Sequence, residues 1–151
     1  MLLSVILPLL LAQATLAQAS SAPQLPPEWK ATAVVNRGQY LRYERQEADG
    51  TQSTLSATKQ HCDCMPSELV SQLTTVFASL PKAAMTHETV SVCGSQAEHL
   101  IVTGVAGGSA RNNIDAYAFR KNGDLYVMTY TFKAAAPAAD ADAALLMLCA
   151  A

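Results

Sequence analysis

Alternating apolar and polar positions predict extended segments along most of this chain. The clearest case is residues 125–133, where four large side chains at every second position would share one face: Tyr126, Met128, Tyr130 and Phe132. The dipeptides Asn122-Gly123 and Asp49-Gly50 each separate a pair of such segments, and both are typical of tight β-hairpins. The pattern predicts strands at residues 29–35, 39–48, 51–61, 89–93, 99–105, 114–120 and 125–133.

Two other stretches have the sequence features of helices. Residues 66–80 place apolar side chains three and four positions apart, at Leu69, Leu73, Val76, Phe77 and Leu80. Pro66 and Glu68 suit the first turn of this helix, and Pro81 ends it. A closing helix is predicted at residues 140–150, because aspartates suit its first turn and leucines follow them.

The order of these elements predicts the fold class. Strands come first, then a helix, then more strands and a last helix, and the turn signals mark antiparallel hairpins rather than βαβ units. We therefore predict an α+β fold, in which an antiparallel β-sheet built from hairpins has two α-helices packed on one face.

The first residues resemble an export signal rather than part of a folded domain. Residues 1–12 are mostly apolar but too few to span a bilayer comfortably, and small residues follow them. We predict a signal peptide at residues 1–19, a proline-rich linker at residues 20–28 and one domain at residues 29–151. The mature protein would be periplasmic or secreted and would have no membrane-spanning segment.

The charge of the chain narrows the choice of partners. Ten Lys and Arg stand against 12 Asp and Glu, which gives a formal net charge of −2 at pH 7. A balance this small and mixed argues against nucleic acid as a partner. The expected partner is a protein or a small molecule of unknown identity.

Four cysteines, Cys62, Cys64, Cys93 and Cys149, carry the strongest chemical signal. In an exported chain this number favours two disulfides. Cys62 and Cys64 would lie about 7 Å apart on one side of an extended chain, too far for an easy bond to each other. Two connectivities remain open: Cys62–Cys93 with Cys64–Cys149, or Cys62–Cys149 with Cys64–Cys93.

A metal site is the alternative interpretation of the same region. His61, Cys62, Cys64 and Met65 place four soft donors within five residues. Cysteine and methionine suit copper(I), and cysteine with histidine suits zinc. This hypothesis needs free thiolates, whereas the disulfide interpretation needs no metal or other cofactor.

From residue 89 onward the sequence combines a turn, a strand and a final helix that carries Cys149. The characteristic residues of the turn and the strand are Gly94, Ala97, Gly123, Leu125, Tyr126, Val127, Thr129 and Tyr130. In these features the chain resembles the PsbP-like family of small exported or lipid-anchored proteins. The resemblance implies an antiparallel sheet with flanking helices and a binding, assembly or accessory role. The Cys62-Asp63-Cys64 segment departs from the family's pattern.

The sequence contains no catalytic signature. His87 and His99 are isolated along the chain, and aspartates at turns and helix starts are explained by local structure. We therefore predict a non-enzymatic exported binding or accessory domain stapled by two disulfides. The alternative is a periplasmic copper- or zinc-binding protein that uses residues 61–65.

Overall fold

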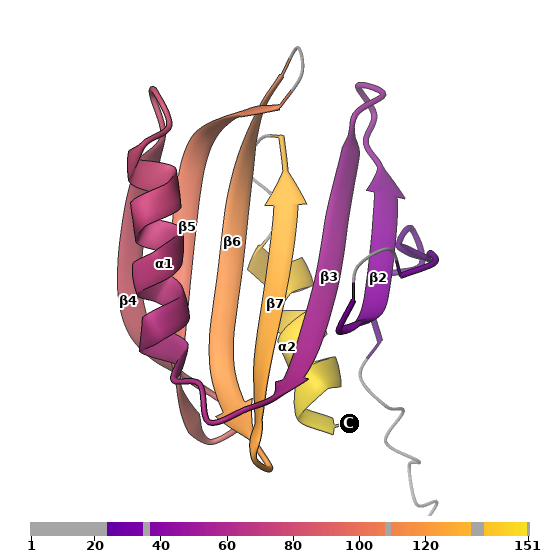
Figure 1. Ribbon diagram of the computed structural model, residues 1–151. Helices are drawn as coiled ribbons and strands as arrows, with labels where there is room; N and C mark the ends of the chain where they lie inside the picture. Colours follow the sequence, from indigo (N-terminus) through magenta and orange to yellow (C-terminus); the bar gives the residue numbers. More distant parts are fainter. Residues whose placement is uncertain (1–23, 35–36, 108–109, 134–137, 151) are drawn as a thin grey trace, which may run out of the picture.

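The computed structural model describes residues 24–34, 37–107, 110–133 and 138–150, so the predicted signal peptide lies outside the described residues. The described residues form one seven-stranded antiparallel sheet and two helices (Figure 1). The helices are α1 (Pro66–Ala78) and α2 (Ala138–Ala150). The strands are β1 (Lys30–Ala31), β2 (Gln39–Gln46), β3 (Gln52–His61), β4 (Ala84–Val92), β5 (Ser95–Gly107), β6 (Ala110–Lys121) and β7 (Asp124–Phe132).

Two groups of consecutive strands, joined by α1, make up the sheet. β1, β2 and β3 pair in chain order, and so do β4, β5, β6 and β7. α1 carries the chain from the end of β3 to the far edge of the sheet, where β4 lies. The second group then returns until β7 pairs with β3, which leaves β4 as an edge strand.

The predicted α+β class, with both helices on one face, is wrong. The structure is mainly β, unlike the PsbP-like arrangement, and its two helices lie on opposite faces of the sheet (Figure 1). Leu100 of β5 packs in the cluster next to α1, whereas Ala97 of the same strand packs in the cluster that includes α2. An odd spacing along a strand reverses the face. Both faces of β5 and β6 are therefore covered by a helix. Turn signals mark which strands form hairpins, and they do not show which face of the sheet a helix covers.

The hairpin turns explain where the strands end. Asn122 and Gly123 have φ values of 53° and 83°, and Cys93 and Gly94 have 53° and 73°. Positive φ at both central positions defines type I′ turns, whose twist matches that of the flanking strands. The predicted turn at residues 94–95 therefore lies one residue earlier, and β4 extends well before its predicted start.

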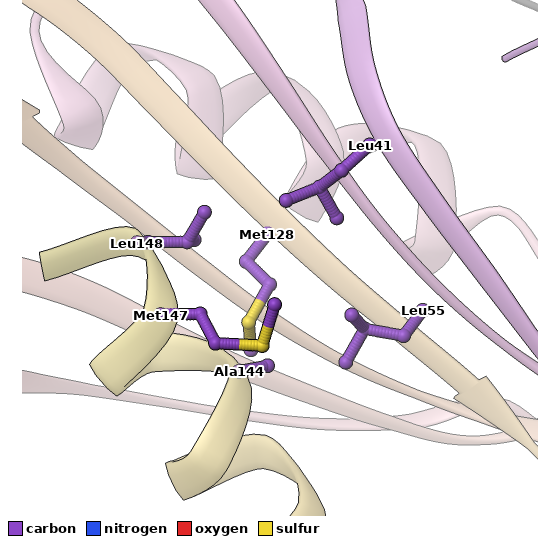
Figure 2. A pocket seen from close by; sticks show the side chains of 6 residues that line it. All are labelled: Leu41, Leu55, Met128, Ala144, Met147 and Leu148. Atoms are coloured by element: carbon purple, nitrogen blue, oxygen red, sulfur yellow. The ribbon is translucent and has the colours of Figure 1, made fainter. Parts of the chain in front are cut away.

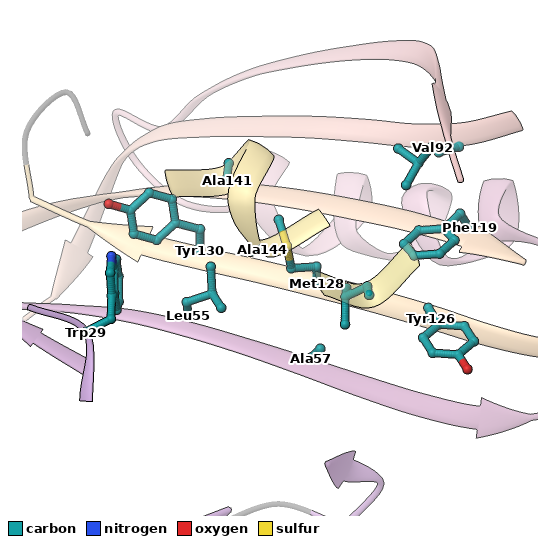
Figure 3. Close-up of a cluster of buried hydrophobic side chains, with 12 residues drawn as sticks. Trp29, Leu55, Ala57, Val92, Phe119, Tyr126, Met128, Tyr130, Ala141 and Ala144 are labelled. Atoms are coloured by element: carbon teal, nitrogen blue, oxygen red, sulfur yellow. The ribbon is translucent and has the colours of Figure 1, made fainter. Parts of the chain in front are cut away.

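The larger core lies between α2 and the sheet (Figure 3). Trp29 and Tyr130 lie at one end of it, and Phe119 and Tyr126 stack at the other with ring centroids 5.5 Å apart. The helix contributes Ala141, Ala144 and Leu148, each with at most 3% of its surface exposed. Small residues on α2 let the helix approach the sheet closely.

A polar network fixes the start of α2 to this core. Asp140, in the first turn of the helix and 4% exposed, accepts hydrogen bonds from Trp29 Nε1 at 3.3 Å and from Arg45. The Arg45 guanidinium also lies 4.8 Å from the centre of the Trp29 ring and donates to the Tyr130 hydroxyl. The first residues of the domain, β2, β7 and α2 thus meet at one buried ion pair.

Candidate functional site

The segment from His61 to Met65 forms the corner between β3 and α1. β3 ends at His61, and the chain turns before α1 begins at Pro66. This turn brings the Cα atoms of Cys62 and Cys64 to 5.2 Å, and the two cysteines form a disulfide. The prediction that they would not easily bond each other was wrong, because it assumed that the extended chain continued through residue 64.

The other two cysteines form the second disulfide. Cys93, in the turn between β4 and β5, bonds Cys149 in the last turn of α2, with Cα atoms 5.1 Å apart. Both expected connectivities are therefore wrong, although the expected number of disulfides is right. The sequence separation is 56 residues for this bond and 2 residues for Cys62–Cys64.

Arg120 of β6 holds the corner from the side of the sheet. One of its amino nitrogens, Nη1, donates to the carbonyl oxygens of Cys62 and Cys64, each at 2.8 Å, and the other donates to Gly123 at 3.2 Å. The Met65 N–H donates to the Glu68 carboxylate at the start of α1. The turn is therefore fixed by hydrogen bonds that do not depend on the disulfide.

His61 binds a carboxylate rather than the neighbouring cysteines. Its Nδ1 lies 2.8 Å from Asp124, and its side chain is 89% exposed. The Lys59 ammonium group, and then His61, hold the pKa of Asp124 below its ordinary value. A hollow of about 540 Å³ is bordered by Lys59, His61 and Arg37.

These contacts bear on the hypothesis of a copper or zinc site at His61, Cys62, Cys64 and Met65. The two sulfur atoms are joined to each other, so this form offers no thiolate. Within the described ranges, no group of three His, Cys, Asp or Glu side chains could hold a metal ion. Met65 instead precedes α1 as its N-cap residue and is half exposed.

An open apolar groove of about 330 Å³ lies between α2 and the end of β4. Leu145, Leu146 and Val92 line it, together with Ser91, Asp142 and the Cys93–Cys149 disulfide. Leu146 keeps 57% of its surface exposed, so it adds accessible apolar surface to the groove. The groove thus presents apolar surface next to the backbone of an edge strand.

A buried histidine lies on the same face of the sheet. His99 of β5 is 7% exposed, and its ring stacks on Tyr117 with centroids 4.1 Å apart. Its Nδ1 lies 2.9 Å from Glu88 and its Nε2 lies 2.7 Å from Asp115. Both carboxylates can accept together only when both ring nitrogens carry a proton.

The electrostatics connect this histidine to the groove. Burial raises the pKa of Asp115 above its ordinary value, the hydrogen bond to His99 opposes this shift, and the negative charge of Asp142 in the groove adds to it. Burial also raises the pKa of Tyr117 to about 12, with Asp115 and Asp142 adding to the effect. Glu88 and Asp115 thus bind the same histidine, and Asp115 lies close enough to Asp142 in the groove for their charges to interact.

Sequence reasoning missed this cluster because it treated His99 as isolated. The register of the β4–β5 hairpin pairs Glu88 directly with His99, and the β5–β6 register pairs His99 with Tyr117. A turn placed at Cys93-Gly94 gives the first of these pairs by counting outward from the turn. The misplaced turn therefore hid the cluster.

A third hollow, beneath α2, is part of the core. Figure 2 shows Leu41, Leu55, Met128, Met147 and Leu148 around Ala144, where the helix meets the strands. The space between these side chains leaves no room for a water molecule. It is a packing contact and not a ligand site.

Comparison with known proteins identifies the fold and no family. No known protein family matches the chain, and neither does any curated protein. None of the helices among the described residues is long and apolar enough to cross a membrane.

Solved structures that share the fold include the following two. LpqN, described as involved in cell envelope biogenesis of Mycobacterium tuberculosis, has a TM-score of 0.56 at 16% identity, over 82% of this chain and 77% of its own. A protein of unknown function from Pseudomonas aeruginosa, PA94, has a TM-score of 0.51 at 9% identity, over 70% of this chain and 83% of its own. Neither comparison names the PsbP-like family, and identities this low show a shared fold only.

Proposed function

We propose that this chain is an exported accessory domain that binds an extended segment of another protein along the groove between α2 and β4. It binds this segment and does not chemically transform it. The observation that carries the proposal is the open apolar groove with Leu146 exposed beside an edge strand. Two disulfides support export, because such bonds persist outside the reducing cytoplasm.

The edge strand supplies the first part of the recognition. One side of β4 pairs with β5, and no strand of the described residues pairs with its other side, where a further strand could be added. An extended segment that pairs with β4 would gain main-chain hydrogen bonds, and every second side chain would point toward the face that carries the groove. Val92, Leu145 and Leu146 would receive apolar side chains there.

Charge supplies the second part. Asp142 lies in the groove, and the Glu88–His99–Asp115 cluster lies on the same face of the sheet. A partner segment with a Lys or Arg next to its apolar residues would complement these carboxylates, whereas an acidic segment would be repelled. The proposed ligand is therefore an extended segment that combines β-branched apolar residues with a basic residue.

Binding of designed peptides tests the proposal. A peptide of alternating Val and Thr ending in Lys is titrated into the isotope-labelled protein, and the same peptide ending in Glu serves as the charge control. We expect amide chemical-shift changes confined to β4 and α2, and weaker binding of the Glu peptide. The absence of binding, or shift changes confined to other elements, would refute the proposal that the groove is the binding surface.

A matched pair of variants sharpens this test. Leu146 on α2 and Val76 on α1 are both 57% exposed, so a charge at either position should cost the fold little. Leu146→Asp should abolish peptide binding, and Val76→Asp should leave it unchanged. If both variants bind the Lys peptide as the wild type does, the groove is not the binding surface.

A further inference from the structure

The Cys62–Cys64 disulfide contributes little to the stability of the fold. It closes a loop between residues only two positions apart, so it removes little conformational freedom from the unfolded chain. The Cys93–Cys149 bond, in contrast, ties the β4–β5 turn to the end of α2 across 56 residues. Two bonds in one domain thus differ greatly in what they contribute to the fold.

The corner around Cys62 and Cys64 is open to another protein. Both cysteines are half-buried, and the residues beside them are more exposed. The side chain of Asp63 is fully exposed, that of His61 is 89% exposed, and Met65 is half exposed. A partner's cysteine can therefore approach this corner without displacing an element of the sheet.

Positive charge lies next to the sulfur-bearing backbone. The Arg120 guanidinium binds the carbonyl oxygens of both cysteines, and α1 begins two residues after Cys64. A cationic group and a helix N-terminus both stabilise a thiolate and so lower the pKa of a cysteine. Cys64 is closer to the helix, so its thiolate would be the more stable leaving group when the disulfide is opened.

The corner also keeps its shape without the bond between the sulfur atoms. Arg120 holds both carbonyl groups at 2.8 Å, and the Met65 N–H binds Glu68. After reduction the two thiols would stay close together, so the disulfide can form again without a search through conformations. Such a pair can change between disulfide and dithiol while the surrounding structure is unchanged.

We infer that Cys62 and Cys64 form the redox couple of a thiol–disulfide exchange site that acts on cysteine pairs of other exported proteins. A thiolate of the partner attacks the Cys62 sulfur, the bond to Cys64 breaks, and Cys64 leaves as a thiolate. The partner's second thiolate then attacks the sulfur of the partner's first cysteine in the mixed disulfide, and Cys62 is released as a thiolate. The partner loses two electrons and two protons as its disulfide forms, and Cys62 and Cys64 become two thiols.

This activity goes beyond the proposed binding function and does not depend on the groove. The corner follows β3 at the centre of the sheet, whereas the groove borders β4 at its edge. The Leu146→Asp variant should therefore exchange disulfides as the wild type does. Failure of one proposal leaves the other standing.

Selective reduction of the wild-type protein is the first test and needs no variant. The oxidised protein is placed in glutathione buffers, free thiols are alkylated over time, and the labelled cysteines are identified by peptide mass. We expect Cys62 and Cys64 to be reduced about tenfold or more faster than Cys93 and Cys149. Equal rates, or earlier reduction of Cys93–Cys149, would overturn the inference.

Trapping with single variants tests the direction of attack. With a reduced one-cysteine peptide under mild oxidation, Cys64→Ser should accumulate a mixed disulfide on Cys62, because neither Cys64 nor a second peptide thiol is present to resolve it. The double variant Cys62→Ser/Cys64→Ser should neither trap this peptide nor speed the oxidation of a reduced two-cysteine peptide. If the double variant oxidises the peptide as fast as the wild type, the corner has no exchange activity.

Arg120 is a positioning residue in this scheme, and its conservative variant separates charge from geometry. Arg120→Lys keeps the charge but lacks the paired amino groups that reach both carbonyl oxygens and Gly123, and Arg120→Gln removes the charge. The pH profile of exchange should move to higher pH in Arg120→Gln and less in Arg120→Lys. An unchanged profile in both variants would remove Arg120 from the mechanism.

Discussion

Removal of the Cys93–Cys149 disulfide should lower the stability of the domain substantially. The bond joins the turn between β4 and β5 to the last turn of α2. α2 is also held by Leu148, which is 1% exposed, and by Lys121, whose Nζ donates to the carbonyl oxygens of Leu148 and Cys149 at 3.1 and 3.0 Å. The helix should therefore stay docked, and the loss should come mainly from the greater freedom of the unfolded chain.

The separation of the two cysteines sets the size of this effect. In the chain-entropy description, a bond across 56 residues contributes about 4 kcal/mol at 25 °C, and a bond across two residues contributes about 1.5 kcal/mol. We therefore expect the double variant Cys93→Ser/Cys149→Ser to lose about 4 kcal/mol of unfolding free energy. The single variant Cys149→Ser should lose about 2–5 kcal/mol and leave one free thiol, on Cys93.

Urea denaturation of the wild type, the two double variants and Cys149→Ser measures the difference. The double variant Cys62→Ser/Cys64→Ser is the matched control, because it also replaces one disulfide by two hydroxyl groups. Midpoints are compared at equal slopes, so that a change in the compactness of the unfolded chain is not mistaken for a change in stability. If the two double variants lose the same stability, or if Cys149→Ser unfolds at the wild-type midpoint, the division of roles between the two disulfides is wrong.

Three further predictions follow from other parts of the chain. Arg45→Ala leaves the buried Asp140 without its cation, so the unfolding free energy in urea should fall by about 3–5 kcal/mol, and a loss below 1 kcal/mol would contradict this ion pair. Because the pKa of Asp115 is raised on folding, the folded protein holds this proton more tightly than the unfolded chain does. The contribution of Asp115 to stability should decrease as pH rises through the folded pKa, and the difference in stability between wild type and Asp115→Asn should change with pH accordingly. N-terminal sequencing of exported protein should begin at Gln18 or Ser20, and a retained leader would contradict the export signal.

Local signals in the sequence predicted β2 to β7 and α1 because each carried its own evidence, whereas the strand predicted at residues 29–35 is only Lys30–Ala31 in the structure. The alternation at residues 125–133 marks β7, whose neighbours on both sides are strands. The proline at position 66 begins α1, and the glycine at position 123 has the positive φ that its turn requires. Features of this kind depend on a few neighbouring residues and so can be read from the sequence.

The fold class and the disulfide pairing depend on three-dimensional arrangement and could not be read in this way. α2 has apolar residues on most sides, so its sequence does not show which side meets the sheet or which face of the sheet it covers. The pairing of Cys62 with Cys64 requires that the chain leave the strand at residue 61, and no glycine or proline marks that point. The pairing of Cys93 with Cys149 requires that the β4–β5 turn and the end of α2 lie together.

The proposed binding surface also has to be selective, because the edge strand β4 could otherwise pair with exposed strands of many proteins. An exposed edge strand is a hazard that proteins reduce with charged side chains. The first part of β4 carries such groups, and His87 lies 2.7 Å from Glu98 on the neighbouring strand. On the face that carries the groove, the apolar side chains of β4 that pack against the core lie near its end, at Val90 and Val92, whereas Met85 packs on the opposite face. A short segment with apolar residues opposite the end of β4 and a basic residue near Asp142 would complement both the apolar end and the charged groups of this region. The same charges that discourage unspecific strand pairing would therefore also select the partner.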